Sequence, residues 1–310
     1  MPDLSLPKLS QMFDKQTLQG AYFALSAYLF WGFVPIYFKF VDQVSPWEIL
    51  CHRVVWSVFL LIGILAYTRQ LGGLKVEAKV VRRLMLSATL LSVNWLVYIY
   101  AVVTSNIVET SLGYFINPLV SVFLGMIFLS ERLRPMQWIA IIIALSGIAI
   151  QLIYYGAVPW IAFTLACSFG TYGLLRKNLG LPSVLGLALE TLVILPFALL
   201  GLLWFYSTGN MAFASVNVQT DVLLVMGGVV TSFPLLCFAA AVTRLSLINI
   251  GMFQYIAPSL SLVVAVVMYD EPFGIDRIIT FTCIWIALTI FTGETIYYHR
   301  RLARRTDVDI

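Results

Sequence analysis

Two oppositely charged side chains lie inside long apolar segments of the sequence. Arg53 and Glu190 each lie about eight residues from the start of their segments, 46–68 and 183–206. An ionisable side chain in a bilayer costs several kcal/mol unless it is paired or hydrated. The two residues are therefore expected to form a buried ion pair with each other or to bind the two ends of a zwitterionic solute. Gating or a proton relay is the remaining alternative.

Three further ionisable side chains lie near the ends of apolar segments. Glu48 and His52 are four positions apart and therefore share one face of a helix near its outer end. They predict either a pair that titrates near neutral pH or a pair that is simply solvated at the mouth of the bundle. Glu109 is either a carboxylate in a cavity or a helix-end residue in contact with water. Glu48 and Glu109 are thus candidates for proton binding or gating.

The sequence lacks the motifs of several enzyme and cofactor classes. It contains no HExxH, GxSxG or paired aspartate motif and no phosphate-binding P-loop. Its four cysteines are not in a CxxC spacing, and its two histidines are far apart. We therefore expect no enzyme activity, no ATP hydrolysis, no metal and no cofactor.

Composition places these residues in a membrane protein. Of 310 residues, 61% are hydrophobic and only 11% are charged, which leaves too little polar surface for a soluble globule. Helices of about 20 residues are long enough to cross a bilayer, and runs such as Ser57–Tyr67 do not alternate as barrel strands do. The sequence predicts an all-α integral membrane fold with ten transmembrane helices. The expected spans are 20–41, 46–68, 84–104, 108–129, 136–154, 158–175, 183–206, 220–243, 247–268 and 277–298.

The distribution of Lys and Arg predicts the orientation. Most of them, including Arg176 and Lys177, fall on the side where the two tails, 1–19 and 299–310, lie. Cytoplasmic segments accumulate Lys and Arg, so both termini are expected in the cytoplasm. The net charge of +4 follows from this topology. It calls for no nucleic-acid partner, and at most the tail contacts anionic lipid.

A shift of 140 residues aligns the two halves of the chain without a gap. The aligned identical pairs include Pro118 with Pro258, Ser121 with Ser261 and Glu131 with Glu271. Because each half has an odd number of helices, two related halves must insert in opposite orientations. The sequence therefore predicts two inverted five-helix repeats, 20–154 and 158–298, around a central cavity, as in alternating-access carriers.

Pro118 and Pro258 are expected to break their helices at matching places. Each of these helices carries a stripe of mostly small and polar residues on one face. The two stripes are Glu109, Gly113, Asn117 and Ser121, and Asn249, Phe253, Ala257 and Ser261. Such a face either packs closely on a neighbouring helix or lines a cavity. The pairs Asn94–Trp95 and Gln254–Tyr255 supply polar and aromatic groups of the kind that bind organic solutes.

Several motifs also give the chain a family resemblance. The stretches "SPWEILCHRVVWS", "SVNWLVYIYAV", "ETSLGYFINPLVSVFLGMIFLSERLRP", "LALETLVILP" and "FQYIAPSLSLVVAVVMYDEPF" resemble the RarD-type permeases in the EamA branch of the drug/metabolite transporter superfamily. The resemblance covers nearly the whole chain. It implies two inverted five-helix repeats, a central cavity, and carriage of small organic solutes across the bacterial inner membrane. The matching site residues are His52, Arg53, Asn94, Trp95, Tyr114, Asn117, Glu190, Gln254 and Tyr255.

Taken together, these features predict a multi-pass permease or exporter of small amino-acid-like or amphipathic metabolites that works by alternating access without ATP. Its expected partners are the solute, membrane lipid and a coupling proton, and it is expected to act as a monomer. One alternative is an exporter of drugs or lipid-like compounds. An alternative of another class is a membrane structural subunit that transports nothing.

Overall fold

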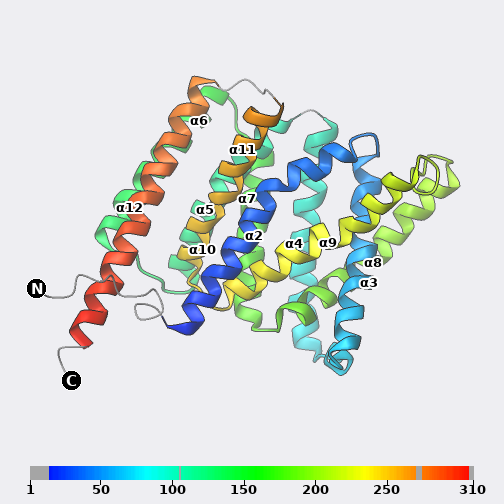
Figure 1. The fold of residues 1–310 in the computed structure, drawn as a ribbon, viewed down its shortest axis with the longest axis horizontal. Helices are drawn as coiled ribbons and strands as arrows, with labels where there is room; N and C mark the ends of the chain where they lie inside the picture. Colours follow the sequence, from blue (N-terminus) through cyan, green and yellow to red (C-terminus); the bar gives the residue numbers. More distant parts are fainter. Residues whose placement is uncertain (1–13, 105, 270–273, 307–310) are drawn as a thin grey trace, which may run out of the picture.

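The computed structural model is a bundle of α-helices and describes residues 14–104, 106–269 and 274–306 (Figure 1). These ranges contain no strand. The helices are α2 (Lys15–Phe40), α3 (Pro46–Tyr67), α4 (Ala78–Val103), α5 (Ile107–Phe128), α6 (Pro135–Tyr155), α7 (Trp160–Leu179), α8 (Ser183–Ser207), α9 (Val218–Val242), α10 (Leu247–Gln254), α11 (Ile256–Tyr269) and α12 (Ile275–Thr306). A short 3₁₀ helix, η1 (Leu71–Leu74), precedes α4.

The predicted helical membrane fold is confirmed. Within the described residues, nine helical segments are long and apolar enough to cross a bilayer, and they coincide with nine of the predicted spans. The remaining span is α7, a helix of 20 residues that carries Arg176 and Lys177 in its last turn. Glu271, which the aligned repeat pairs with Glu131, lies outside the described ranges.

The two prolines at matching positions behave differently. The span 247–268 is divided into α10 and α11 just before Pro258, so a break is present there. Pro118, by contrast, lies inside a continuous α5, and the break expected at Pro118 is not present. Proline removes one backbone hydrogen bond, and close packing by a neighbouring helix can hold the remaining turns in place. The neighbour here is α10, where a Cβ on Gly251 would lie only 2.7 Å from the Pro118 carbonyl oxygen.

Aromatic side chains fill the core where α2, α7 and α9 meet. The rings of Tyr172 and Phe238 stack with their centroids 5.9 Å apart, and the ring of Tyr28 meets Phe238 edge-on. A second core lies between α5, α6 and α12, where Phe115 and Phe281 pack edge to face at 5.1 Å. Each ring pair adds to the free energy gained from burial, by about 0.5–1.5 kcal/mol.

Glycines allow helix backbones to touch at the interface of α3 with α9. A Cβ built on Gly228 would lie 2.6 Å from the backbone carbon of Trp56, and one on Gly227 would lie 2.8 Å from the Tyr37 hydroxyl. Membrane helices associate through such small residues because lipid supplies no hydrophobic force between them. This contact brings α9 up to the middle of α3, where Arg53 lies.

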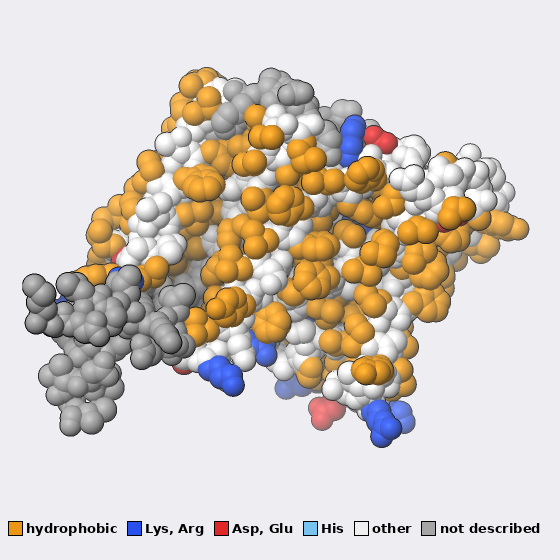
Figure 2. All heavy atoms as spheres, viewed as in Figure 1, with side chains coloured by type: hydrophobic (Ala, Val, Ile, Leu, Met, Phe, Trp, Pro, Cys, Tyr) orange, Lys and Arg blue, Asp and Glu red, His pale blue; other side chains and the backbone are white. Residues whose placement is uncertain are grey.

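The outer surface matches a lipid environment. Figure 2 shows hydrophobic side chains over the sides of the bundle, with Lys and Arg gathered mainly at its lower end. Large apolar residues are widely exposed, for example Tyr67 at 90%, Phe197 at 73% and Trp204 at 58%. Exposed apolar surface of this extent marks a face that contacts lipid or a partner. In Figure 1, α2 begins and α12 ends at the same lower end.

The helices contact one another in a regular set of pairs. α3 packs on α9 and α4 on α8, while α2 packs on α9 and α4 on α7. α5 packs on α7 and α2 on α11. The remaining main pairs are α3 with α8, α5 with α10 and α6 with α12. Most of the contacts of α12 are with α6, and the two form a separate layer at the left of Figure 1.

Candidate functional site

Arg53 is held inside the bundle without a carboxylate partner. Its Nε donates to the hydroxyl of Thr231 on α9 at 2.7 Å. Its guanidinium lies 5.5 Å from the ring centroids of both Phe38 on α2 and Trp95 on α4, within cation–π range. No carboxylate among the described residues forms an ion pair with it. Within the described part of the chain, its charge is therefore balanced by dipoles and ring faces.

Tyrosines complete the surroundings of Arg53. The hydroxyls of Tyr37, Tyr98 and Tyr114 lie close enough to interact electrostatically with the guanidinium. Tyr114 is 48% exposed, although its neighbour Phe115 on α5 is only 4% exposed. We call this set the arginine–aromatic group. It consists of Tyr37, Phe38, Arg53, Trp95, Tyr98, Tyr114 and Thr231. It offers a cation and several hydroxyls beside aromatic faces, a combination suited to an amphipathic solute that carries a carboxylate.

Glu190 has a different partner from the one expected. Its carboxylate pairs with Arg176 on α7, with Nη1 3.7 Å from Oε1, and not with Arg53. The hydroxyl of Ser87 on α4 donates to Oε1 at 2.6 Å, and the hydroxyl of Tyr172 donates to Oε2 at 3.2 Å. Glu190 is completely buried. The predicted ion pair between Glu190 and Arg53 was therefore wrong. Because the Glu190 carboxylate is fully buried in this structure, none of its surface is accessible to a solute.

Arg176 is the buried charge that the sequence misplaced. Its position at the end of α7 put it among the loop charges, yet its side chain is only 1% exposed. Gly186 makes this possible, because a Cβ there would lie 1.9 Å from Nη1 of Arg176. No nitrogen of the guanidinium has a hydrogen-bond partner among the described residues. The Glu190 cluster, as we call it, consists of Ser87, Tyr172, Arg176 and Glu190.

The polar stripe on α5 packs against other helices. A Cβ on Gly113 would lie 3.2 Å from the backbone of Ala162 on α7. Ser121 donates to Oε1 of Gln254 on α10 at 3.2 Å. Asn117 is 9% exposed, and its Oδ1 has no partner among the described residues. This stripe was expected either to pack closely on a neighbouring helix or to line a cavity, and the structure shows close packing.

Other predicted site residues are also engaged in packing. Asn94 donates to the Leu165 carbonyl at 2.9 Å and to the Ser168 hydroxyl at 3.0 Å, which joins α4 to α7. Gln254 is 4% exposed. Tyr255 is fully buried, and its hydroxyl has no partner among the described residues.

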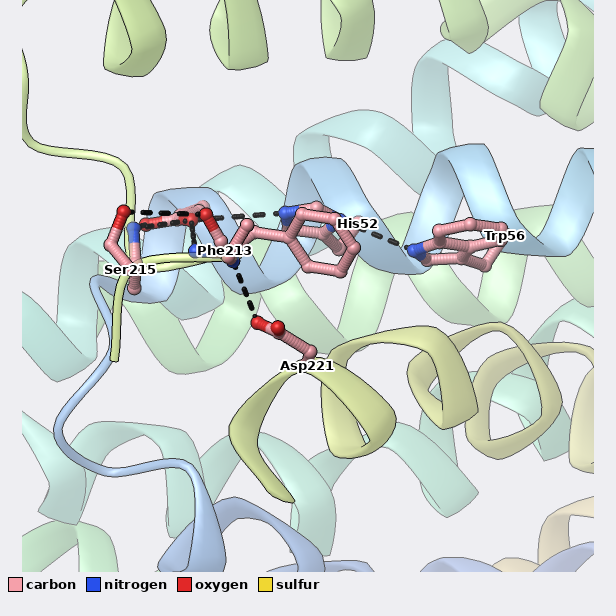
Figure 3. Close-up of polar contacts among 8 residues, drawn as sticks. His52, Trp56, Phe213, Ser215 and Asp221 are labelled. Atoms are coloured by element: carbon pink, nitrogen blue, oxygen red, sulfur yellow. Dashed lines mark hydrogen bonds and ion pairs between the residues drawn. The ribbon is translucent and has the colours of Figure 1, made fainter. Parts of the chain in front are cut away.

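Glu48 and His52 form a buried group and not a solvated pair. Oε1 of Glu48 accepts from the backbone nitrogens of Ala212 and Phe213, at 2.9 and 3.0 Å, and Oε2 accepts from Ala212 at 3.0 Å. Nε2 of His52 lies 3.7 Å from the carboxylate, and Trp56 donates to Nδ1 at 3.2 Å. Figure 3 shows His52 and Trp56 in line along α3, with the Phe213 ring against His52. Glu48 therefore fixes the loop between α8 and α9.

Glu109 has a comparable role at another loop. It accepts from the Tyr155 hydroxyl at 2.6 Å and from the Ile161 backbone nitrogen at 3.0 Å, and so joins α5 to the connection between α6 and α7. Glu131 accepts from the backbone nitrogens of Leu247 and Ile248 at 2.7 and 2.9 Å, at the start of α10. Carboxylates are favoured at such helix N-termini because the N–H groups there have no partner within the helix.

Comparison with known proteins identifies the class. Residues 18–153 match the model of the EamA-like transporter family. The protein RarD of Escherichia coli strain K12 is 44% identical over 94% of this chain and 99% of its own length. An uncharacterized transporter of Vibrio cholerae is 46% identical over 89% of this chain and 92% of its own. The chain therefore belongs to the EamA-like transporter family and is a multi-pass membrane transporter.

Within that family, the full-length matches place the chain in the RarD type, as its motifs indicated. The transporter YojE of Bacillus subtilis is also similar, with 41% identity over 92% of this chain and 97% of its own. A solved crystal structure shares the fold, with a TM-score of 0.69 at 18% identity over 89% of this chain and 98% of that one.

Proposed function

We propose that the chain is an inner-membrane permease for small amino-acid-like or amphipathic metabolites, which bind at the arginine–aromatic group. The observation that carries this proposal is Arg53, a cation inside the bundle with no carboxylate partner among the described residues. Arg53 is half-buried, and a charge within a membrane span that has no counter-ion is costly unless water or a ligand compensates it. The carboxylate of a solute supplies that compensation, and Tyr114 and Trp95 accommodate its apolar part.

The proposed mechanism is alternating access between inverted repeats at 20–154 and 158–298. The main packing pairs map onto one another when each helix is exchanged with its counterpart in the other half. The counterparts are α2 and α7, α3 and α8, α4 and α9, α5 and α10 with α11, and α6 and α12. For example, α3 on α9 becomes α8 on α4, and α5 on α7 becomes α11 on α2. This correspondence supports a two-fold relation between the halves, about which one half can rock against the other.

The proposed orientation has both termini in the cytoplasm. It is supported by the Lys and Arg side chains gathered at the end of the bundle where α2 begins and α12 ends (Figures 1 and 2). We propose that the chain acts as a monomer, since ten helices suffice to enclose a complete path.

Export of drugs or other apolar compounds is the second candidate. The aromatic faces around Arg53 favour it, and a Pseudomonas aeruginosa relative with 29% identity bears the name "Chloramphenicol-sensitive protein RarD". The two candidates differ in what the cation contributes, because a neutral drug does not need Arg53 as an ion-pair partner.

The test is a thermal-shift screen of the purified protein against amino acids, nucleosides, peptidoglycan fragments and chloramphenicol. A ligand that binds the folded state raises the apparent melting temperature. We expect a shift from a carboxylate-bearing class in the wild type, and its loss in Arg53→Gln, because a charge-assisted hydrogen bond of about 1.5–3 kcal/mol is removed.

The matched control is Arg82→Gln, which changes an exposed arginine on α4 and is expected to keep the ligand shift. A shift that Arg53→Gln retains in full would refute binding at Arg53. A shift from neutral apolar compounds alone would favour the drug candidate.

A further inference from the structure

Four buried or half-buried carboxylates among the described residues fall into two kinds, according to the donors that face them. Glu48, Glu109 and Glu131 each accept at least one backbone N–H. A backbone N–H can only donate, so it stabilises the ionised carboxylate and would lose its partner if the carboxyl took up a proton at that oxygen. These three side chains therefore fix loops through hydrogen bonds that a carboxylate accepts from the backbone.

Glu190 is surrounded differently, because its hydrogen-bond donors are two hydroxyls. Ser87 and Tyr172 donate to it in this form at 2.6 and 3.2 Å. A hydroxyl both donates and accepts, so either group can accept a hydrogen bond from a protonated carboxyl without moving. Ser87 and Tyr172 can therefore stay hydrogen-bonded to Glu190 in either of its protonation states.

Protonation of Glu190 would leave Arg176 without its ion-pair partner. Its guanidinium is 1% exposed, has no hydrogen bond among the described residues, and has Glu190 as its only described ion-pair partner. The ionisable groups that act on Glu190 are Arg176 and Tyr172, both on α7. The helices α3 and α9, which also pack on α8, place no ionisable side chain against the carboxyl in the part of the chain that is described. Neutralising Glu190 would leave an unpaired buried charge, which is strongly unfavourable until water reaches it.

We propose that Glu190 is the proton-binding site of the transport cycle, and that proton uptake breaks its ion pair with Arg176 and opens the end of the bundle where that pair lies. The proposal rests on the alternating-access function proposed above and adds the coupling ion. The proton adds to Oε1 or Oε2, the net charge of the cluster rises by one, and the freed guanidinium takes water as its new partner. Arg176 lies on α7 and Glu190 on α8, so this loss frees two helices of the second proposed repeat from each other, while the Ser87 hydroxyl still joins α8 to α4.

The experiment follows water access through the native Cys237, which lies 8% exposed on α9 in the same hydrophobic core as Tyr172. Cys51, Cys167 and Cys283 are replaced by alanine, and the full chain in liposomes reacts with N-ethylmaleimide between pH 5 and 8. We expect Glu190→Gln, which mimics the protonated carboxyl, to raise the rate at pH 7.5 by about tenfold over the parent. The ratio should fall towards one as the pH is lowered, because the parent then becomes protonated as well. The pH dependence of the Cys237 thiol itself affects both proteins alike, so it cancels in this ratio.

Two controls separate proton coupling from damage to packing. Glu109→Gln changes a carboxylate held by a backbone N–H and should react like the parent at each pH. The double variant Glu190→Gln with Arg176→Met removes both charges and should return the rate to the slow value at every pH. If Glu190→Gln does not accumulate, the parent is compared with the double variant, and its relative rate should rise as the pH falls.

Equal rates for the parent and Glu190→Gln at every pH would overturn the proposal. A double variant as reactive as Glu190→Gln would also overturn it, since the effect would then be lost packing. Neither result depends on a solute, so both are distinguishable from failure of the ligand screen with Arg53→Gln.

Discussion

Gly228→Ala is expected to lower the stability of the protein strongly, because the added methyl group meets the backbone of a neighbouring helix. The new Cβ would lie 2.6 Å from the backbone carbon of Trp56, 2.7 Å from its Cβ and 2.8 Å from its carbonyl oxygen. A backbone cannot move aside as a flexible side chain can, so α3 and α9 must separate. Overpacking of this kind costs about 1–3 kcal/mol and occasionally more.

The measurement is the thermal unfolding temperature of purified protein in detergent. Gly63→Ala is the matched control, since Gly63 is also helical, lies on α3 and has nothing within 4 Å of its Cβ position. We expect that control to keep or slightly raise the unfolding temperature, because alanine favours a helix over glycine by about 1 kcal/mol. Equal unfolding temperatures for the two variants would contradict the close approach of α3 and α9.

Glu48→Ala is expected to release the loop between α8 and α9. The substitution removes the acceptor of the backbone N–H groups of Ala212 and Phe213, and takes away the carboxylate beside His52. Each buried N–H left without a partner costs about 1–3 kcal/mol. The expected results are a lower unfolding temperature and faster proteolysis within residues 208–217.

Asp42→Ala is the control for Glu48→Ala. Asp42 lies near the same end of the bundle, but its only described ion pair is with Lys39, and both side chains are more than half exposed. An exposed pair of this kind is worth about 0–1 kcal/mol, so proteolysis should not change. Unchanged cleavage in Glu48→Ala would mean that Glu48 does not fix the loop, and that other contacts such as the Ala214–Asp221 hydrogen bond hold it.

The helices could be predicted because their signal is local. Spans such as 183–206 are continuous apolar runs whose length is fixed by the bilayer, and α8 occupies Ser183–Ser207. The division into α10 and α11 was also signalled locally, by Pro258. The continuity of α5 through Pro118 was not, because it depends on the contact with Gly251 on a helix far along the chain.

The site was predicted less completely for the same reason. The sequence indicated that Arg53 and Glu190 are charges within membrane spans, but it could not show which groups face them. Glu190 pairs with Arg176, which looked like a loop residue because its Cα lies in the last turn of α7. The missing signal was Gly186, whose lack of a side chain leaves room for the guanidinium over α8.

The loop-fixing carboxylates have a consequence for biosynthesis. Glu48 acquires its backbone partner at Ala212, 164 residues later, and Glu131 acquires its partner at Leu247, 116 residues later. When the ribosome has released only the first half of the chain, these acids have no partners and the helix ends that carry them are unsecured. The nascent protein must therefore keep its early helices near the insertion machinery until the later ones arrive, and a chain cut after α6 should be degraded by membrane proteases instead of persisting.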